Sequence, residues 1–218
     1  MLSHNLFDWQ PQIEGNEMSA IVADDRDLEI PPFPVRRWTV EQYELIARLG
    51  ILDEDDQLEL LDGWIVPKTT KNPRHDATLD VINQYLLSLL PHGWFVRIQN
   101  VLLTPDSAPE PDITVVAGKP RDYMARHPTG NDLALVIEVA DTSVDRDRLK
   151  RRIYARAGVS NYWIVNLVEN QIEAHTGIIG TGRDTDYRDM SVIQVEDRIS
   201  FELPRHRNIV IAVADLLP

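Results

Sequence analysis

Leu133-Ala-Leu-Val-Ile-Glu-Val139 is an almost wholly apolar run. Because its apolar residues do not alternate with polar ones, it predicts a β-strand that is buried on both faces of a sheet. Residues 145–157 follow with a helical pattern that ends at Gly158, and Tyr162-Trp-Ile-Val165 predicts a second buried strand. A strand, a helix and a strand in this order indicate a parallel crossover. We therefore expect an α/β (α+β) fold in which helices flank a mixed central β-sheet.

Shorter elements are predicted before and after this crossover. Thr39 and Gln42 form a capping-box pattern that opens a helix, and Gly50 is positioned to end it. Asp62-Gly63 predicts the turn of a β-hairpin, and the apolar spacing over residues 74–90 predicts a longer helix. Strands are expected over residues 58–61, 64–66, 94–98, 101–103, 113–116, 172–175, 192–195 and 209–213.

The length of 218 residues favours a single hydrophobic core. Residues 1–34 hold seven acids against one base and end in a cluster of prolines, which predicts a flexible acidic arm. Residues 35–218 are expected to form one domain. The chain has no cysteine, which excludes disulfides, thiolate zinc sites and cysteine catalysis. No apolar run approaches the roughly 20 residues that cross a bilayer, so we expect a cytoplasmic protein without a membrane partner.

The charge of the chain is unevenly distributed. The net charge of −13 counts against tight non-specific binding to DNA, which depends on neutralising phosphates. Residues 145–156, however, hold six Lys or Arg against two Asp. Arg146 and Arg148 in this stretch are candidate phosphate-binding residues that would position a DNA backbone without reading its sequence.

Two carboxylates occupy unusual positions. Glu138 interrupts the buried run near its end, where an ionised carboxylate is costly unless it is paired or bound to a metal. Asp112 follows Pro111 and opens the strand at 113–116, at an end of the sheet where α/β proteins bind ligands. Together the two acids suggest a site for Mg²⁺, with Mn²⁺ as a substitute. The competing readings are a turn or cap for Asp112 and a simple salt bridge for Glu138.

Lys150 lies twelve residues after Glu138, on the helix that returns across the sheet. An amine there could orient the attacking water and stabilise negative charge that develops on phosphorus. We place Lys150 on the inward stripe of the helix with Asp147 and Tyr154, and we expect Arg151 to face solvent. The competing reading is that Lys150 belongs to a solvated basic face.

These residues resemble a known family. The segments are Leu58-Glu-Leu-Leu-Asp-Gly-Trp-Ile-Val66, His75, Glu110-Pro-Asp-Ile113, Leu135-Val-Ile-Glu-Val139, Lys150 and Tyr154-Ala-Arg-Ala-Gly-Val-Ser-Asn-Tyr-Trp-Ile-Val165. In order and spacing they resemble the Uma family of bacterial restriction-endonuclease-like proteins, within the PD-(D/E)xK nuclease superfamily. The resemblance extends over about residues 37–215. It implies a restriction-endonuclease-like core, a metal-dependent DNA endonuclease and a homodimer.

The resemblance also implies roles for single residues. Asp112 matches the aspartate of the PD motif, and Glu138 matches the acidic member of (D/E)xK. The motif lysine is absent because its position is Ala140, and Lys150 takes its place. Glu59 matches an additional acid beside the metal, while His75 and Tyr154 match neighbours of the site.

Two other functions compete with a nuclease. A catalytically inactive nuclease fold could serve as a binding or assembly module for a protein partner, which would suit the acidic arm and the net charge. A glycosidase with two carboxylates is the weakest alternative, because a nearby lysine and a basic helix favour phosphate. Gly177–Gly182 are followed by neither Lys-Ser/Thr nor a helix, so no nucleotide cofactor is expected, and these glycines should serve a flexible loop.

Overall fold

The apolar run forms β5 (Leu133–Ala140) in the computed structural model, and all eight of its residues are buried. The basic segment forms α3 (Val144–Arg156), and the second apolar run forms β6 (Asn161–Asn166). β5 and β6 pair in parallel, so the predicted crossover is confirmed. Asn166 ends β6 opposite Ala140, at the same end of the sheet as Glu138.

The structure describes residues 35–52, 54–204, 206 and 208–217. The expected acidic arm at residues 1–34 lies outside the described residues. Residues 37–218 form one compact unit, which contains the helices and strands described here. Within the described part of the chain, no helix has both the length and the apolar character needed to cross a membrane.

Six strands form the central sheet in the order β3-β4-β5-β6-β7-β8, and all neighbours except β5 and β6 are antiparallel. The mixed α/β fold is as expected. The remaining strands of this sheet are β3 (Trp94–Ile98), β4 (Ile113–Ala117), β7 (Gln171–Ile179) and β8 (Asp186–Ile193). Two hairpins lie outside it, formed by β1 (Leu58–Leu61) with β2 (Trp64–Pro67) and by β9 (Arg198–Phe201) with β10 (Ile209–Ala212).

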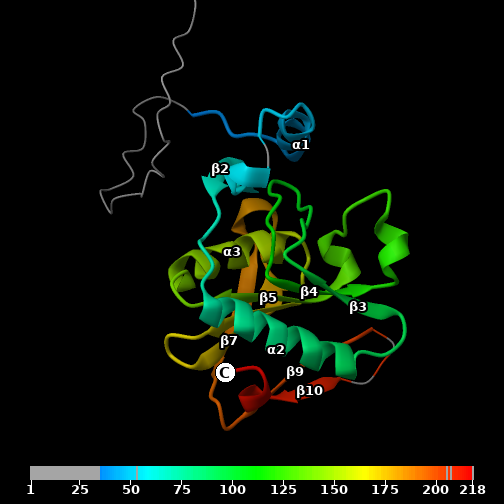
Figure 1. The fold of residues 1–218 in the computed structure, drawn as a ribbon, viewed down its shortest axis with the longest axis vertical. Helices are drawn as coiled ribbons and strands as arrows, with labels where there is room; N and C mark the ends of the chain where they lie inside the picture. The colour runs from blue at the N-terminus through cyan, green and yellow to red at the C-terminus, as the bar shows by residue number, and fades with distance from the viewer. Residues whose placement is uncertain (1–34, 53, 205, 207, 218) are drawn as a thin grey trace, which may run out of the picture. The chain divides into compact units, whose positions relative to one another are not determined.

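Helices cover both faces of the sheet (Figure 1). α2 (Pro73–Leu89) packs with the β9–β10 hairpin on one face, against Leu135, Ile137 and Val139 of β5. α3 packs on the other face, against Val136 and Ala140. Successive residues of a strand point to opposite faces, so Glu138, between Val136 and Ala140 in this alternation, faces α3.

The first helix, α1 (Val40–Arg48), begins as the sequence predicts. Thr39 accepts a hydrogen bond from the Gln42 backbone, and the Gln42 side chain accepts one from the Thr39 backbone. The β1–β2 turn uses Asp62 and Gly63, both with positive φ. A Cβ on Gly63 would lie 2.7 Å from the Arg37 side chain, so glycine is required here for space as well as for backbone geometry.

Several predicted elements are wrong. Residues 101–103 form a loop that contributes one isolated bridge, from Leu103 to Thr129, although Leu102 is buried. β7 continues through Gly177 to Ile179, where we expected a loop. β8 begins at Asp186 rather than at residue 192, because the charged residues of an exposed edge strand hide the apolar pattern. β9 was not expected at all.

Candidate active site

Glu138 and α3 meet on one face of the sheet. The buried residues of α3 include Asp147, Lys150 and Tyr154, which are three, four and seven positions apart and therefore share one side of the helix. The Lys150 Nζ atom lies 3.1 Å from Glu138 Oε1, and the Tyr154 hydroxyl donates to the same oxygen at 2.5 Å. The helix thus delivers an amine and a phenol to a carboxylate that is 3% exposed.

Asp112 lies beside Glu138 at the start of β4. Its backbone N–H donates to Glu138 Oε2 at 3.3 Å, while its own Oδ2 accepts from the Val139 N–H at 2.9 Å. Each carboxylate is therefore bound to the backbone of the other strand, and the expected convergence of the two acids is observed. His75 Nε2 lies 3.1 Å from Asp112 Oδ2, and Gln99 donates to Oδ1 at 3.2 Å.

A third acid, Glu59, reaches the site from β1. Its side chain is 3% exposed and binds Arg146 at 2.6 Å, and its Oε1 lies 3.7 Å from Lys150 Nζ. Asp147 lies 3.5 Å from the same amine. Lys150 is thus surrounded by three carboxylates and is almost fully buried, which rules out the solvated basic face as an explanation of this lysine.

Burial governs the protonation of this group. It raises the pKa of Glu138 to about 8, although the Lys150 ammonium beside it acts in the opposite direction. Burial alone would lower the pKa of Lys150, but Glu138, Glu59 and Asp147 outweigh it and raise that pKa. One ammonium therefore faces three acids, and Glu138 is protonated in a large share of molecules at neutral pH.

Asp112 behaves differently from Glu138. Burial would raise its pKa, but the hydrogen bonds from His75, Val139 and Gln99 prevail and lower it. The hydrogen bond to Asp112 in turn raises the pKa of His75 to about 9. Asp112 and His75 therefore form an ion pair at neutral pH, which holds the carboxylate ionised and fixed in orientation.

These side chains line a cavity of about 50 Å³, whose wall also includes residues 68–72 and 141–143. Such a volume admits an ion with a few waters. Within the described residues, no group of three or more His, Asp or Glu side chains is arranged to hold a metal ion. Mg²⁺, however, needs only one or two carboxylates and completes its shell with waters and phosphate oxygens. Asp112 and Glu138 fit this requirement. The pKa of Glu138 is raised mainly by burial and further by the nearby Asp147 and Asp112 carboxylates, whose negative charge a cation would balance.

Comparison with known proteins agrees with this geometry. The model of the Uma2 family, described as "Putative restriction endonuclease", matches residues 40–214. The chain belongs to the Uma2 family. A crystal structure of "a putative nuclease belonging to DUF820" from Anabaena variabilis has a TM-score of 0.60 and 13% identity, and the match covers 84% of this chain and 97% of that one. At this identity the likeness shows a shared fold. No curated protein matches the chain.

The basic residues of α3 in this Uma2 protein do not form a free phosphate-binding face. Arg148 binds Glu173 of β7 and does not line the cavity, and Arg146 is taken up by Glu59. Arg151 and Arg152 both bind Asp186 of β8. A carboxylate thus pairs with each of Arg146 and Arg148, and contact of these two arginines with phosphate remains a prediction. Arg151 is 40% exposed and points away from Glu138.

Two residues near the Uma2 site are not predicted as site residues from the sequence. Asp147 approaches Lys150, and Gln99 holds Asp112. Asp147 carries a detectable signal, since it lies on the inward stripe of α3. No sequence pattern marks Gln99 as a site residue, because it follows an edge strand and comes close to Asp112 only through the pairing of β3 with β4. The functional roles of Asp112, Glu138, Lys150 and Glu59 remain predictions.

Proposed function

We propose that this Uma2 protein is a metal-dependent endonuclease that hydrolyses phosphodiester bonds in DNA. One observation carries the proposal. Two strand-end carboxylates and a buried lysine converge on a cavity. Buried ionisable groups that meet in a cavity are typical of functional sites. The family and the shared fold point to a nuclease, and they support this reading of the cavity.

Asp112 and Glu138 would hold Mg²⁺, with Mn²⁺ as a substitute. When bound, a divalent cation would supply Lewis-acid activation of the scissile phosphate. Loading requires Glu138 to release its proton, because a ligand carboxylate binds metal in its ionised form. The His75 hydrogen bond already keeps Asp112 ionised.

The residues of the chain supply the remaining chemistry. The Lys150 ammonium, held by Glu138, Glu59 and Asp147, would orient the attacking water and stabilise charge that develops on the phosphoryl oxygens. Water would attack phosphorus in line with the leaving oxygen, and the P–O bond opposite the water would break. The attacking water would release one proton to solvent, and the leaving oxygen would take one up from solvent. Tyr154 fixes the Glu138 carboxylate through its hydroxyl group.

The direct test measures cleavage of a plasmid and of labelled oligonucleotides with Mg²⁺ or Mn²⁺, together with calorimetric binding of Mn²⁺. Asp112→Asn should lower both metal affinity and cleavage by at least about 100-fold. Lys150→Met should abolish cleavage but change metal affinity by only a few-fold, because the amine acts on water rather than on the ion. Arg152→Ala, on the outer side of α3, serves as the matched control. Full cleavage by Asp112→Asn would contradict the proposal.

A catalytically inactive binding module is the second candidate. It is favoured by the mutual neutralisation of the basic residues of α3, and by the lack of a three-residue metal cluster among the residues that the structure describes. A wild-type protein that binds no Mn²⁺ and cleaves nothing would support it.

We also propose a homodimer, since closed two-fold dimers are by far the commonest oligomers of soluble proteins. Sedimentation of the full chain measures this state.

A further inference from the structure

A larger groove adjoins the cavity of the candidate site. Its volume is about 920 Å³, and it shares four residues with that cavity, Lys68, Lys71, Gln99 and Glu110. Its other walls come from α1, from the start of β1 and from the loop after β3. We call it the side groove; the lining residues used below are Tyr43, Arg48, Leu58, Lys68, Lys71 and Leu103. Any ligand in the side groove would continue directly into the cavity that holds Asp112 and Glu138.

The cations of the side groove differ from those of α3. Arg48 and Lys71 are exposed, and neither pairs with a carboxylate among the described residues. The Lys71 amine binds only the neutral Gln99 side chain, at 2.6 Å. Lys68 is paired with Glu110 at 2.8 Å. The side groove therefore offers two cations that can bind phosphate without breaking an ion pair.

An aromatic ring, that of Tyr43, lines the groove from α1, the helix that also carries Arg48. The Tyr43 hydroxyl donates to the Leu58 carbonyl at 3.1 Å, which fixes the side chain at the edge of the groove. Leu58, Val101 and Leu103 add apolar surface to the same lining. Cations together with a fixed aromatic ring are the combination by which proteins bind single-stranded nucleic acid, since bases stack on the ring while the backbone meets the cations.

The depth of the acids selects the form of the substrate. The side chain of Asp112 is 13% exposed and that of Glu138 is 3% exposed, so a scissile phosphate must enter the cavity to reach them. A single strand can bend its phosphates into such a recess at less cost than a duplex, whose backbone is stiff. With few free cations and a net charge of −13, the protein is also poorly suited to a long duplex backbone.

We propose that the side groove binds unpaired nucleotides next to the scissile phosphate, so that the substrate is single-stranded or locally unpaired DNA. The continuation of the strand into the cavity rests on the function proposed above, but binding of the strand in the side groove does not. Stacking on Tyr43 and contacts with Arg48 and Lys71 would supply the affinity.

Fluorescence anisotropy of the full chain in EDTA separates binding from cleavage. The probes are a labelled 12-nucleotide single strand and the same sequence as a blunt duplex. Wild type should bind the single strand at least tenfold more tightly than the duplex. The double variant Arg48→Ala/Lys71→Ala should lose at least tenfold in single-strand affinity, and the slope of log affinity against log salt should fall in magnitude by about 1.4. Tyr43→Leu should lose at least fivefold, while Tyr43→Phe, which keeps the ring, should bind within about twofold of wild type.

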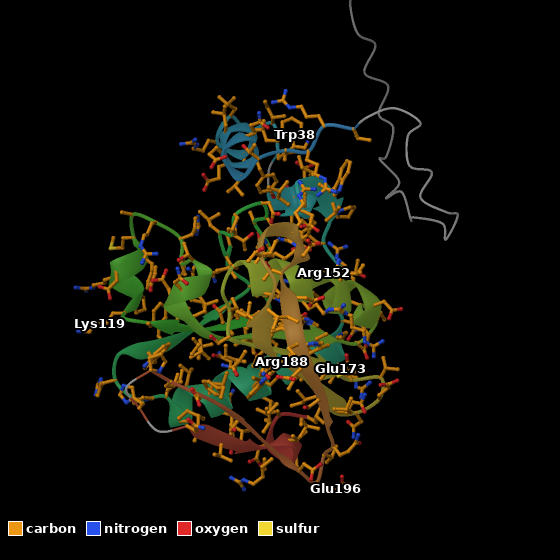
Figure 2. The ribbon with its side chains drawn as sticks, turned by 180° about the vertical axis from the view of Figure 1, so that it is seen from behind. Trp38, Lys119, Arg152, Glu173, Arg188 and Glu196 are labelled. Atoms are coloured by element: carbon orange, nitrogen blue, oxygen red, sulfur yellow. The ribbon has the colours of Figure 1, made fainter. Side chains whose placement is uncertain are left out.

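Lys119 provides the matched control. Figure 2 shows it at the edge of the molecule, two residues after the end of β4 that lies opposite Asp112. Lys119→Ala should leave both affinities within twofold of wild type. Equal affinity of wild type for duplex and single strand, or unchanged binding by the Arg48→Ala/Lys71→Ala protein, would overturn the proposal. Failure of the proposed nuclease function is distinct, because it would abolish cleavage while leaving the EDTA binding pattern intact.

Discussion

The two sides of α3 both form ion pairs between basic side chains and carboxylates, but the pairs on one side are buried and those on the other are exposed. On the inner side, Lys150 meets carboxylates in an almost dry environment, and burial raises the pKa of Glu138 to about 8. On the outer side, Arg151 and Arg152 meet Asp186 at the surface, where solvent weakens the attraction. Figure 2 shows Arg152 on this outer side. The sequence supplies both sets of charges within one helix, and burial distinguishes them: it raises the pKa of Glu138 on the inner side, whereas the arginines lower the pKa of Asp186 on the outer side.

The strongest way to break this comparison is Lys150→Met. Removing the amine leaves Glu138, Glu59 and Asp147 without their buried cation, so the free energy of unfolding should fall by about 3–5 kcal/mol at pH 8. The loss should be smaller at pH 5.5, because protonation of the acids relieves the uncompensated charge. Urea unfolding at both pH values measures it. A decrease in the free energy of unfolding of less than 1 kcal/mol at pH 8 would show that the buried ion pairs contribute no more to stability than the exposed ones.

A second test uses the ion pair between His75 and Asp112. The pKa of His75 is raised to about 9, so its protonated form stabilises the fold fully below the ordinary histidine pKa of about 6.5. This contribution is lost as the pH rises from 6.5 through 9. The stability advantage of wild type over His75→Gln should therefore be about 2 kcal/mol at pH 6 and should decrease toward pH 9.5. In an Asp112→Asn background the pH dependence of this difference should shrink to the smaller part that Asp76 contributes through its contact with His75 Nδ1. Persistence of the full pH dependence would exclude Asp112 as the main cause.

The smallest effect on stability is expected for a substitution on the outer side of α3. Arg152 is 59% exposed and shares Asp186 with Arg151, so Arg152→Ala should change the free energy of unfolding by no more than about 0.5 kcal/mol. The change should shrink further in 1 M salt, which screens exposed pairs. Thermal unfolding with and without salt measures it. A cost of 2 kcal/mol would place this pair in the same class as the inner side.

The parts of the fold that the sequence predicts well are those set by local chemistry. The capping box at Thr39 and Gln42, the Asp62-Gly63 turn and the strand at 133–139 each depend on a few neighbouring residues. The inward stripe of α3 also follows from helical periodicity, and it places Lys150 correctly. The convergence of Asp112 and Glu138 is predictable because each carboxylate stands at a strand end.

The parts that the sequence hides are those set by distant partners. The ion pairs that the α3 arginines make with Glu173 and Asp186 cannot be predicted from the sequence, because these acids lie on the later strands β7 and β8. The start of β8 is hidden because an edge strand carries charges on both faces. The side groove brings α1 and β1 together with the loop after β3, which lies much later in the chain, so no local sequence pattern predicts it.

The position of Lys150 on a helix has a consequence for how such proteins are found and how they diverge. A lysine two residues after Glu138 would be tied to it by the strand itself, whereas here Ala140 fills that position as a small buried residue. The distance between acid and amine is instead set by how α3 docks on the sheet, through contacts such as those of Tyr154 and Ala155. A pattern search with a fixed interval will pass over this arrangement. Over evolutionary time, the loop that joins β5 to α3 can lengthen or shorten without separating the pair, as long as the docking of the helix is preserved.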